Sequence, residues 1–477
     1  MLRTKIVCTL GPASGDMGTI RAFAAAGMAM ARINFSHGTH QEHTQRIKMV
    51  RQVAEEIGCP IAVLADLQGP KLRVGLLPQE GVQLVKGETI TLLDADSSKE
   101  PNKIPIPHPE VLREVEPGDR ILLDDGLLEL KVQSKDKHQV QTSVVTEGVL
   151  TSRKGISLPH TSIKMPSVTE KDQADARFAV EQEVDYFALS FVRSPEDVRH
   201  LRAFLADLDS QTPIIAKIEK PEAVDCIEEI LSVSDGMMVA RGDLGVEAPA
   251  EEVPIIQKRI IHLCNRASKP VITATQMLDS MIRNPRPTRA EASDVANAIL
   301  DGSDAIMLSG ETAVGSYALQ SVQTMARIAQ VTERSMPYQD WLHRSLSSGS
   351  RDVTEAFSQV ATEIAAELQA RAIVASTISG STARRVASHR PSTPIIAPTP
   401  RTSTYRQLAL VWGVFPLWVE QFTDTETMIV TVIEAARQRN LVEDDDLVII
   451  TAGVPLGGTG LTNTVKAHRV GEERGWR

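Results

Sequence analysis

The chain has 477 residues, more than one hydrophobic core normally uses, and with 42% hydrophobic and 23% charged residues it is ordinary for a folded soluble protein, so we expect two or three domains. The net charge of −10 argues against non-specific binding to nucleic acid and to an anionic membrane surface, so an anionic substrate has to meet local basic residues. The cysteines are scattered without metal-ligand spacing, which is typical of reduced core residues in a cytoplasmic protein: Cys8, Cys59, Cys226 and Cys264.

The N-terminal stretch predicts two strands separated by a helix. The chain runs straight into a strand over 5–10, with no signal peptide, and no apolar run is long enough to span a bilayer. A helix over 20–26 leads to a strand over 30–38. Polar and apolar side chains alternate along that strand, and its polar face holds Arg32, Asn34 and Ser36. Polar side chains on a strand that is otherwise buried are costly unless they bind a ligand.

The texture of the sequence changes after a third strand. A helix over 40–57 leads to a strand over 61–64 that ends near Asp66. From 74 to 165 the pattern consists of short alternating runs with frequent Gly and Pro, which predicts a small β-barrel or sandwich with strands at 82–84, 89–92, 120–123, 127–132 and 140–145. A unit inserted at the end of a strand hangs over the mouth of the fold, so it is a candidate lid.

Strands and helices alternate again from Ser167 onwards. Further strands are predicted at 186–190, 214–216, 237–240, 271–276 and 305–308. The sequence thus has eight predicted strands, and each except the third is followed by a helix. This number and order predict an α/β fold of the (β/α)8 TIM-barrel type. Active sites of such barrels lie at the carboxyl ends of the strands, which here hold Arg32, Asn34, Ser36, Asp66, Lys217, Glu219, Asp243, Thr275 and Ser309.

The most informative stretch is the strand–helix–strand unit over 214–245, with its helix over 221–233. Its two strands are parallel, so Glu219 and Asp243 converge at one edge with Lys217 beside them. Two carboxylates suit a hard cation such as Mg²⁺, and the lysine offers a positive charge to an anion forming on the substrate. Solvated surface charges are the alternative for one such cluster. Thr288 and Glu291 favour a simpler role, a capping box for the helix over 289–300.

A third unit follows about residue 339. A linker over 345–350 leads to a helix over 353–369 and to strands at 372–376, 395–397 and 447–451, which predict a small α/β domain. The loop 377–382 opens a helix over 383–388 and offers N–H groups and hydroxyls to an anion, although an ordinary capping loop has the same residues. A second Gly-rich stretch over 453–463 makes a phosphate site more credible, and it is not a dinucleotide fingerprint.

Several runs closely resemble the pyruvate kinase family, and the resemblance covers essentially the whole chain. They are residues 32–38, 217–219, 240–245, 273–278, 285–291 and 307–312. The resemblance implies a phosphotransferase that moves phosphoryl from phosphoenolpyruvate to ADP, giving pyruvate and ATP in the last step of glycolysis. It implies a catalytic barrel over 1–69 and 166–340, an inserted β-rich lid over 70–165 and a C-terminal α/β effector-binding domain over 345–477.

The resemblance also implies roles for residues. Glu219 and Asp243 match the ligands of Mg²⁺, for which Mn²⁺ is a possible substitute, and Lys217 matches the lysine that stabilises the phosphoryl group and the enolate. Thr275 and Ser309 match residues near the proton that the enolate gains, which we expect a bound water to donate. The remaining matches are substrate contacts (Arg32, Lys217, Arg241, Gly242, Asp243, Thr275) and nucleotide or phosphate contacts (Arg32, Asn34, His37, Arg73).

One departure from the family pattern concerns the monovalent cation. Potassium-dependent members carry Glu where this chain has Lys71, and Leu67 and Gln68 also differ from their pattern. The family's oxygen ligands for the monovalent cation are matched by Asn34, Ser36 and Asp66. The ammonium of Lys71 could supply the positive charge beside them, so we predict that this chain belongs to a potassium-independent subgroup.

The resemblance further implies regulation and assembly. An allosteric phosphorylated effector would bind the loop residues Thr377, Ser379, Gly380, Ser381 and Thr382, and we favour a monophosphate such as AMP, ribose 5-phosphate or glucose 6-phosphate. Family members are usually homotetramers, and no nucleic acid or membrane partner is expected. Two other functions are open from the residues alone: a Mg²⁺-dependent aldolase or lyase on the same barrel, and a catalytically silent sugar-phosphate sensor.

Overall fold

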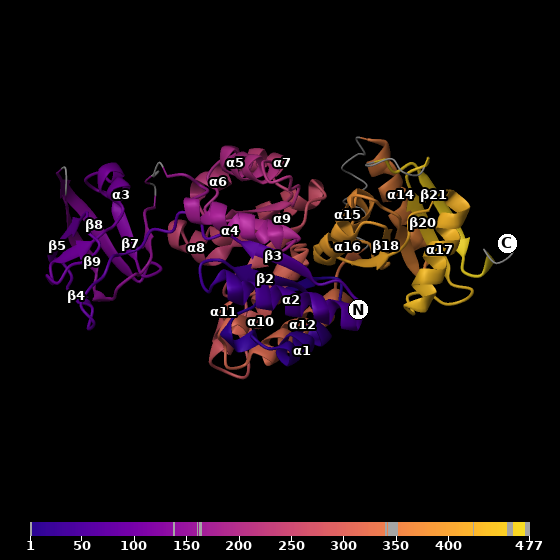
Figure 1. Cartoon of the computed structure of the whole chain (residues 1–477), viewed down its shortest axis with the longest axis horizontal. Coiled ribbons are helices and arrows are strands. Elements are labelled where there is room, and N and C mark those ends of the chain that lie inside the picture. Colours follow the sequence, from indigo (N-terminus) through magenta and orange to yellow (C-terminus); the bar gives the residue numbers. More distant parts are fainter. Residues whose placement is uncertain are drawn as a thin grey trace.

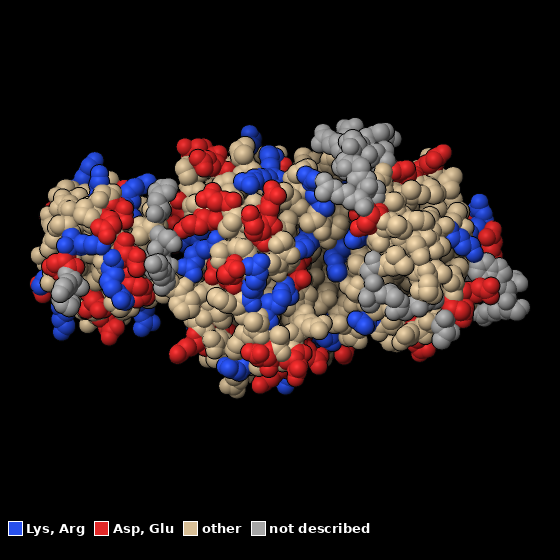
Figure 2. Space-filling view, turned by 90° about the horizontal axis from the view of Figure 1, so that it is seen from above, with Lys and Arg blue, Asp and Glu red and all other residues tan. Residues whose placement is uncertain are grey.

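The computed structural model describes residues 2–136, 139–159, 161, 165–338, 341, 352–422, 424–455 and 461–472. They form three bodies in a row along the long axis, with the barrel in the middle (Figure 1). Acidic and basic side chains are interspersed over the face of all three bodies seen in Figure 2. The predicted linker over 345–350 and residues 456–460 of the Gly-rich stretch lie outside the described residues.

The middle body is the predicted (β/α)8 barrel. Its strands close in the order β1-β16-β15-β14-β13-β12-β3-β2, and every neighbouring pair is parallel. The strands are apolar because a parallel sheet covered by helices is buried on both faces. Their bounds are β1 (Lys5–Thr9), β2 (Met28–Asn34), β3 (Ala62–Asp66), β12 (Tyr186–Leu189), β13 (Ile214–Ile218), β14 (Gly236–Ala240), β15 (Val271–Ala274) and β16 (Ala305–Leu308).

Helices surround the barrel, and they correct one prediction and confirm another. The helix predicted over 221–233 is interrupted at Cys226, whose ψ of 34° leaves the helical region. The predicted capping box of Thr288 and Glu291 is confirmed. The helices are α1 (Met17–Ala26), α2 (His40–Ile57), α4 (Glu170–Glu181), α5 (Pro195–Ala206), α6 (Pro221–Asp225), α7 (Ile227–Val233), α8 (Arg241–Glu247), α9 (Val253–Arg266), α10 (Arg289–Leu300), α11 (Gly310–Ala313) and α12 (Ala318–Arg334), with single turns η1 (Pro12–Ser14) and η2 (Asp279–Ile282).

The second strand is shorter than predicted. It ends at Asn34, because the side-chain oxygen of Asn34 accepts the backbone N–H of Ser36 at 3.1 Å and turns the chain. Ser36 and His37 therefore lie in the turn after β2, so the prediction that they continue the strand is wrong.

The inserted body leaves the barrel after β3 and returns before α4. It contains a six-stranded sheet, β11-β7-β8-β9-β5-β6, a small two-stranded sheet, β10-β4, and its own hydrophobic core. All five strands predicted for this region are present, and the shortest elements and a helix were not predicted. The bounds are β4 (Val82–Leu84), β5 (Thr89–Leu93), β6 (Lys103–Pro105), α3 (Pro109–Glu114), β7 (Arg120–Leu123), β8 (Leu128–Lys135), β9 (Gln139–Thr146), β10 (Gly148–Leu150) and β11 (Ile156–Ser157).

The C-terminal body is an α/β unit at the other end of the barrel (Figure 1). Its sheet has the order β19-β18-β17-β20-β21, and β21 is antiparallel to β20. The predicted strands and helices are present, and β19, β21, α16 and α17 are additional. The bounds are α14 (Val353–Glu367), β17 (Ala372–Ala375), α15 (Ser381–Ser388), β18 (Ile395–Thr399), α16 (Thr402–Gln407), η3 (Leu408–Leu410), β19 (Val414–Trp418), α17 (Thr425–Gln438), β20 (Leu447–Ala452) and β21 (Thr464–Arg469).

The C-terminal body closes the amino end of the barrel. Ala409 and Leu410 of η3 belong to the buried cluster inside the barrel, beside residues such as Val7 and Met30, and Leu410 is fully buried. The Tyr186 hydroxyl on β12 donates to the carbonyl of Gln407 at 3.0 Å. The carboxyl ends of the strands are thereby left as the accessible mouth.

Two further expectations from the sequence concern the burial of the cysteines and the absence of a membrane-spanning segment. Cys8 and Cys264 are buried, but Cys59 is exposed, so placing all four cysteines in the core is wrong. Cys59 follows Gly58, the left-handed C-cap of α2, and lies in the loop before β3. Among the described residues, no helix combines the length and apolarity that crossing a membrane would need.

Candidate active site

Lys217 lies at the centre of a charged network at the barrel mouth. It comes from β13, and its ammonium contacts Glu219 Oε1 at 2.9 Å, Asp66 Oδ1 at 3.2 Å and Ser190 Oγ at 2.7 Å. Burial acts to lower the pKa of Lys217, but the negative charges of Asp66 and Glu219 outweigh it and raise the pKa above its ordinary value. The lysine is therefore a buried, permanently charged cation.

Asp66 holds a second cation beside this lysine. It ends β3, is 1% exposed, and its Oδ2 accepts Arg32 Nε at 2.6 Å, while Arg32 also donates to Thr9 Oγ1 at 3.0 Å. Burial opposes ionisation of Asp66, yet Lys217 and Arg32 together lower its pKa. One carboxylate thus fixes two positive groups side by side.

Glu219 and Asp243 are the two carboxylates at this mouth that the sequence predicts as metal ligands. Glu219 is 1% exposed, and its Oε2 accepts the backbone N–H of Phe191 at 2.7 Å. Burial raises the pKa of Glu219; Lys217 offsets part of that effect, and the charge of Asp243 adds to it. A buried carboxylate and a partly exposed one that repel each other fit a divalent cation. Over the described ranges no three or more His, Cys, Asp or Glu side chains are grouped so that they could hold a metal ion, so such an ion would also need substrate or water oxygens.

Thr275 follows β15 in a strained turn. Its φ of 69° and that of Gln276, 54°, are left-handed, which is rare for a β-branched residue such as threonine. Its hydroxyl accepts the N–H of Gly242 at 2.7 Å and donates to the carbonyl of Ala274 at 2.6 Å. The neighbouring loop after β14 therefore holds the hydroxyl in one orientation.

Arg241 faces this turn. Its guanidinium donates to the carbonyl of Thr275 at 2.9 Å and pairs with Asp294 on α10 at 2.6 Å. The side chain predicted as a substrate contact is thus engaged with protein groups, where it supports the strained turn.

Ser309 sits at the carboxyl end of β16 with an orphan hydroxyl. Its Oγ is buried and has no hydrogen-bond partner within the described part of the chain. Its backbone N–H donates to Glu311 Oε2 at 2.7 Å, and Glu311 Oε1 accepts the N–H of Leu278 at 3.0 Å. A buried glutamate thereby ties the loops after β15 and β16 together and leaves the serine hydroxyl available for a bound molecule.

Basic groups line the crevice between the inserted body and the barrel. The pKa of His37 is lowered first by partial burial and then by the charges of Arg73, Lys71 and Arg32, so these groups lie close to one another. Arg73 donates to the carbonyl of Arg153 at 2.9 Å, and Lys71 lines the crevice together with Asp243. Of the predicted phosphate and nucleotide contacts, Arg32, Asn34 and His37 thus come from β2 and the turn after it, and Arg73 comes from the insertion.

The predicted monovalent-cation ligands are grouped at the ends of β2 and β3. Asn34 is the register partner of Asp66, and the carbonyl of Leu67 accepts the hydroxyl of Ser190 at 2.7 Å. Ser36 is in the turn that Asn34 caps. Lys71 lies two residues after Gly69, whose carbonyl accepts the Lys71 N–H at 2.9 Å, and the described residues offer the Lys71 ammonium no hydrogen bond or ion pair.

Sequence reasoning missed three members of the site. Ser190 contacts Lys217, Thr9 contacts Arg32, and Glu311 orients Ser309. Ser190 and Thr9 end or follow strands, so the strand-end rule applied to every strand would have found them. Glu311 is three residues beyond the end of β16, and sequence spacing carries no signal for its contact with Leu278.

The predicted effector loop has a defined shape. Gly380 is left-handed, with φ 85°, and its N–H donates to Thr377 Oγ1 at 2.9 Å. The hydroxyls of Ser379 and Ser381 are 3.2 Å apart. Thr382 Oγ1 is 2.9 Å from Thr462 Oγ1, which brings the loop to the end of the Gly-rich stretch.

Comparisons with known proteins agree with this architecture. A family model described as the barrel domain of pyruvate kinase matches residues 1–322, and one described as its alpha/beta domain matches residues 355–468. Curated pyruvate kinases from Geobacillus stearothermophilus and Sporosarcina psychrophila are 46% identical to this chain over 473 and 475 residues, which is 98% and 99% of this chain and 81% of each relative. One from Staphylococcus aureus strain MRSA252 is 45% identical over 475 residues. The chain belongs to the pyruvate kinase family.

Proposed function

We propose that the barrel mouth transfers a phosphoryl group from phosphoenolpyruvate to ADP, giving pyruvate and ATP, the last step of glycolysis. The observation that carries this assignment is the buried ammonium of Lys217, held between Asp66 and Glu219 with Arg32 on the far side of Asp66. Phosphoryl transfer through a loose transition state needs positioned positive charge more than a covalent nucleophile. The mouth offers that charge at fixed positions.

The cationic residues at the mouth would contact different parts of the substrates, according to their positions. Lys217 would stabilise the phosphoryl group in transfer and the enolate left behind, while Arg32 and Arg73 would hold phosphate oxygens from the barrel side and the lid side. Asn34 and His37 would contact the nucleotide from the turn after β2. Preorganised charges of this kind cost no reorganisation when the reaction occurs.

Glu219 and Asp243 are the residues that would hold Mg²⁺, which the family generally requires, or Mn²⁺. The mutual repulsion of the two carboxylates and the burial of Glu219 support this assignment. When bound, the ion would offset negative charge on the substrate oxygens. The backbone of Gly242 and Asp243 would contact the substrate, and Arg241 would hold the Thr275 turn in place.

Protonation of the enolate would fall to Thr275, Ser309 and a bound water. The Thr275 hydroxyl is anchored by Gly242 and Ala274, so it suits the orientation of a water rather than proton donation by itself. The buried, partnerless hydroxyl of Ser309 would complete the relay.

We also propose that the enzyme does not require potassium. The ammonium of Lys71 would replace the monovalent cation, close to Asn34, Ser36, Asp66 and the Leu67 carbonyl. Its charge already acts on His37 at the mouth, which supports the idea. In this reading Lys71→Glu lowers activity in tetramethylammonium buffer, and added K⁺ restores it.

The direct experiment measures pyruvate formation from phosphoenolpyruvate, ADP and Mg²⁺, with and without K⁺. Turnover in both conditions supports the kinase and the role of Lys71. Turnover only with K⁺ keeps the kinase and rejects that role. Absence of turnover would favour a Mg²⁺-dependent aldolase or lyase, and effector binding without turnover would favour a silent sensor.

Allosteric control by a phosphorylated effector would act through the loop 377–382. Thr404 Oγ1 donates to the carbonyl of Ile378 at 2.8 Å, and Leu408 packs against Gly380. Leu410, two residues further, lies inside the barrel. This short path from the loop to the barrel interior supports coupling between an effector monophosphate and the mouth.

The remaining expectations concern organisation. We propose the division into a barrel over 1–69 and 166–340, a lid over 70–165 and an effector domain over 345–477. The protein would act as a cytoplasmic homotetramer. Size-exclusion chromatography with light scattering checks the assembly.

A further inference from the structure

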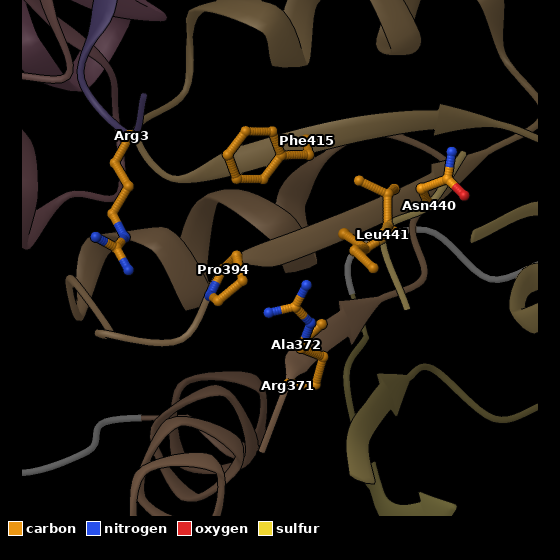
Figure 3. A pocket seen from close by; sticks show the side chains of 8 residues that line it. Arg3, Arg371, Ala372, Pro394, Phe415, Asn440 and Leu441 are labelled. Carbon is orange, nitrogen blue, oxygen red and sulfur yellow. The ribbon is translucent and has the colours of Figure 1, made fainter. Parts of the chain in front are cut away.

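The inserted body is attached to the barrel differently from the C-terminal body. Side chains of the N-terminal segment and of the C-terminal sheet, such as Arg3 and Phe415, line one crevice together (Figure 3), and the Arg3 guanidinium donates to the carbonyl of Ser392. In the described part of the chain, the hydrogen bonds between the barrel and the inserted body lie at the two linkers that join them, 67–71 and 165–169. The groups that hold these linkers therefore set the position of the inserted body over the mouth.

Asp172 holds the outgoing linker, 67–71. It lies in the first turn of α4, it is fully buried, and its Oδ1 accepts the N–H of Gly69 at 3.0 Å. Its Oδ2 accepts the N–H and the hydroxyl of Thr169 at 2.9 Å and 2.6 Å, and Thr169 ends the returning linker, 165–169. One carboxylate thus ties both linkers to the amino end of α4, where the helix dipole favours a negative charge.

The backbone at Gly69 fits closely against the loop after β12. Its φ of 67° is left-handed, and a β-carbon added there would lie 3.0 Å from the Phe191 ring and 3.1 Å from the β-carbon of Ser190. The Ser190 hydroxyl donates to the carbonyl of Leu67 at 2.7 Å, and its oxygen accepts the ammonium of Lys217 at 2.7 Å. The outgoing linker is therefore packed against a residue that contacts the central lysine of the mouth.

The outgoing linker leads to two cations. The N–H of Lys71 donates to the carbonyl of Gly69 at 2.9 Å, and Arg73 follows two positions later. Lys71 lines the crevice between the inserted body and the barrel. The returning linker is held separately, by Arg193, which donates to the carbonyl of Met165 at 2.6 Å. A shift of the backbone at Gly69 would therefore move both cations relative to the barrel.

Capping of α4 does not by itself account for the burial of Asp172. Asp16, at the N-cap of α1, accepts the N–H and the hydroxyl of Thr19 at 2.9 Å and 2.6 Å, and it is exposed. Burying a carboxylate costs free energy unless its hydrogen bonds are satisfied. The bond to a distant backbone N–H, that of Gly69, distinguishes Asp172 from this simple cap.

We propose that Asp172 is a positioning residue for phosphoryl transfer: its hydrogen bond to the Gly69 N–H fixes the pivot of the inserted body and thereby holds Lys71 and Arg73 over the mouth. The carboxylate acts through the linker backbone and does not contact a substrate. The kinetic consequence rests on the proposed function, whereas the tether itself is a property of the fold that can be measured without turnover.

Hydrogen–deuterium exchange of the full chain, followed by mass spectrometry of overlapping peptides, measures the tether. Asp172→Ala removes the acceptor of the Gly69 N–H, and Thr169→Val, the matched control, removes the hydroxyl of the cap and leaves that acceptor in place. We expect the Gly69 amide to exchange about tenfold faster or more in Asp172→Ala, and within about twofold of the parent rate in Thr169→Val. Thermal unfolding checks that both variants are folded. In the parent, a Gly69 amide that exchanges as fast as an unstructured peptide would overturn the proposal without any variant.

The Michaelis constants separate the tether from a loss of stability. KM for ADP should rise about fivefold or more in Asp172→Ala, because the cations on the inserted side move, while KM for phosphoenolpyruvate changes less than about twofold, because Lys217 and Glu219 belong to the barrel. A merely structural role lowers the amount of active protein and leaves both KM values unchanged. An unchanged KM for ADP in Asp172→Ala, or an equal rise in Thr169→Val, would overturn the proposal. If the parent showed no turnover, the proposed function would fail, and the exchange rates would still decide on the tether.

Discussion

The two ends of the barrel each bury an arginine–aspartate pair, and the two pairs serve different purposes. At the mouth, Arg32 and Asp66 are 2.6 Å apart; at the amino end, Arg390 and Asp304 are 2.9 Å apart. Both aspartates lie at the end of, or directly before, a barrel strand. Pair chemistry and burial are thus similar, and the difference lies in what surrounds each pair.

The pair at the amino end is enclosed by protein partners. Arg390 also donates to Asn265 and to the carbonyl of Gly302, both at 2.6 Å, and lies over the Trp412 ring at 5.0 Å. Asp304 also accepts the N–H of Trp412 at 3.1 Å. Its partners come from the barrel and the C-terminal body, so this pair joins the two.

The pair at the mouth shares its aspartate with a second cation. Asp66 holds both Arg32 and Lys217, whereas Glu219 shares Lys217 and also faces the negative charge of Asp243, which adds to the rise in the pKa of Glu219. The excess positive charge on the Asp66 side can serve a phosphate, and the excess negative charge on the Glu219 side can serve Mg²⁺. The comparison teaches that a buried arginine–aspartate pair is structural where other protein groups enclose it, and functional where the aspartate is shared by two cations whose remaining charge can serve a ligand.

Lys217→Met has the largest expected effect, because it removes one of the two cations that share Asp66 at the mouth. We expect turnover to fall by about 10³-fold or more, because a preorganised charge at the reacting group is lost. Steady-state kinetics of pyruvate formation measures the effect. Lys258→Met, which alters an exposed lysine paired with Asp301, is the control and should change turnover less than about twofold. A loss of less than tenfold in Lys217→Met would break the comparison.

Arg390→Met tests the enclosed pair. Removing the cation leaves Asp304 buried without its charge partner, which should lower the free energy of unfolding by about 3–5 kcal/mol. The first transition in urea unfolding, followed by circular dichroism, measures the loss. Turnover of the folded protein should stay within a few-fold of the parent. Recovery of part of the stability in Arg390→Met/Asp304→Asn would sharpen the assignment, and unchanged unfolding of the single variant contradicts it.

Leu410→Ala opens the closure of the barrel at the amino end. The side chain is fully buried inside the barrel, so the cavity should cost about 2–5 kcal/mol. Activation by the effector should also weaken, because Leu410 lies on the path from the loop 377–382. Thermal unfolding and activation curves measure the two effects. Leu368→Ala, at a position that is 48% exposed, should leave both nearly unchanged; equal effects of the two variants would argue against the path.

Thr275→Ala has the smallest expected effect. It should slow enolate protonation by about 10- to 100-fold, less than removal of a group that donates the proton itself, and should slow phosphoryl transfer less. Solvent hydrogen exchange into the pyruvate methyl group reports the first step, and ATP formation reports the second. Thr275→Ser keeps the hydroxyl and serves as the control. An equal loss in both steps would remove Thr275 from the proton relay.

Local patterns in the sequence predict most of the barrel correctly because each strand is a short apolar run and each carboxyl end carries a polar residue. The same rule selects Lys217, Glu219, Asp243, Thr275 and Ser309 as site candidates. Most of the elements that were missed are short, such as α16, β19 and the lid strands β6, β10 and β11. Burial in their own units, rather than local preference, holds these segments in place. The exception is α17, whose buried residues recur with a helical period and could have been found in the sequence.

The sequence by itself determined the alternation of strands and helices, the inserted β-rich unit and the polar groups at the strand ends, because periodicity and strand direction are local properties. Only the tertiary structure decided which charges meet. Asp66 and Lys217 are 151 positions apart and touch because β3, β12 and β13 are successive neighbours in the closed barrel. The closure of the barrel by Leu410 and the enclosure of Arg390 depend on how two bodies pack, and no short-range pattern encodes that contact.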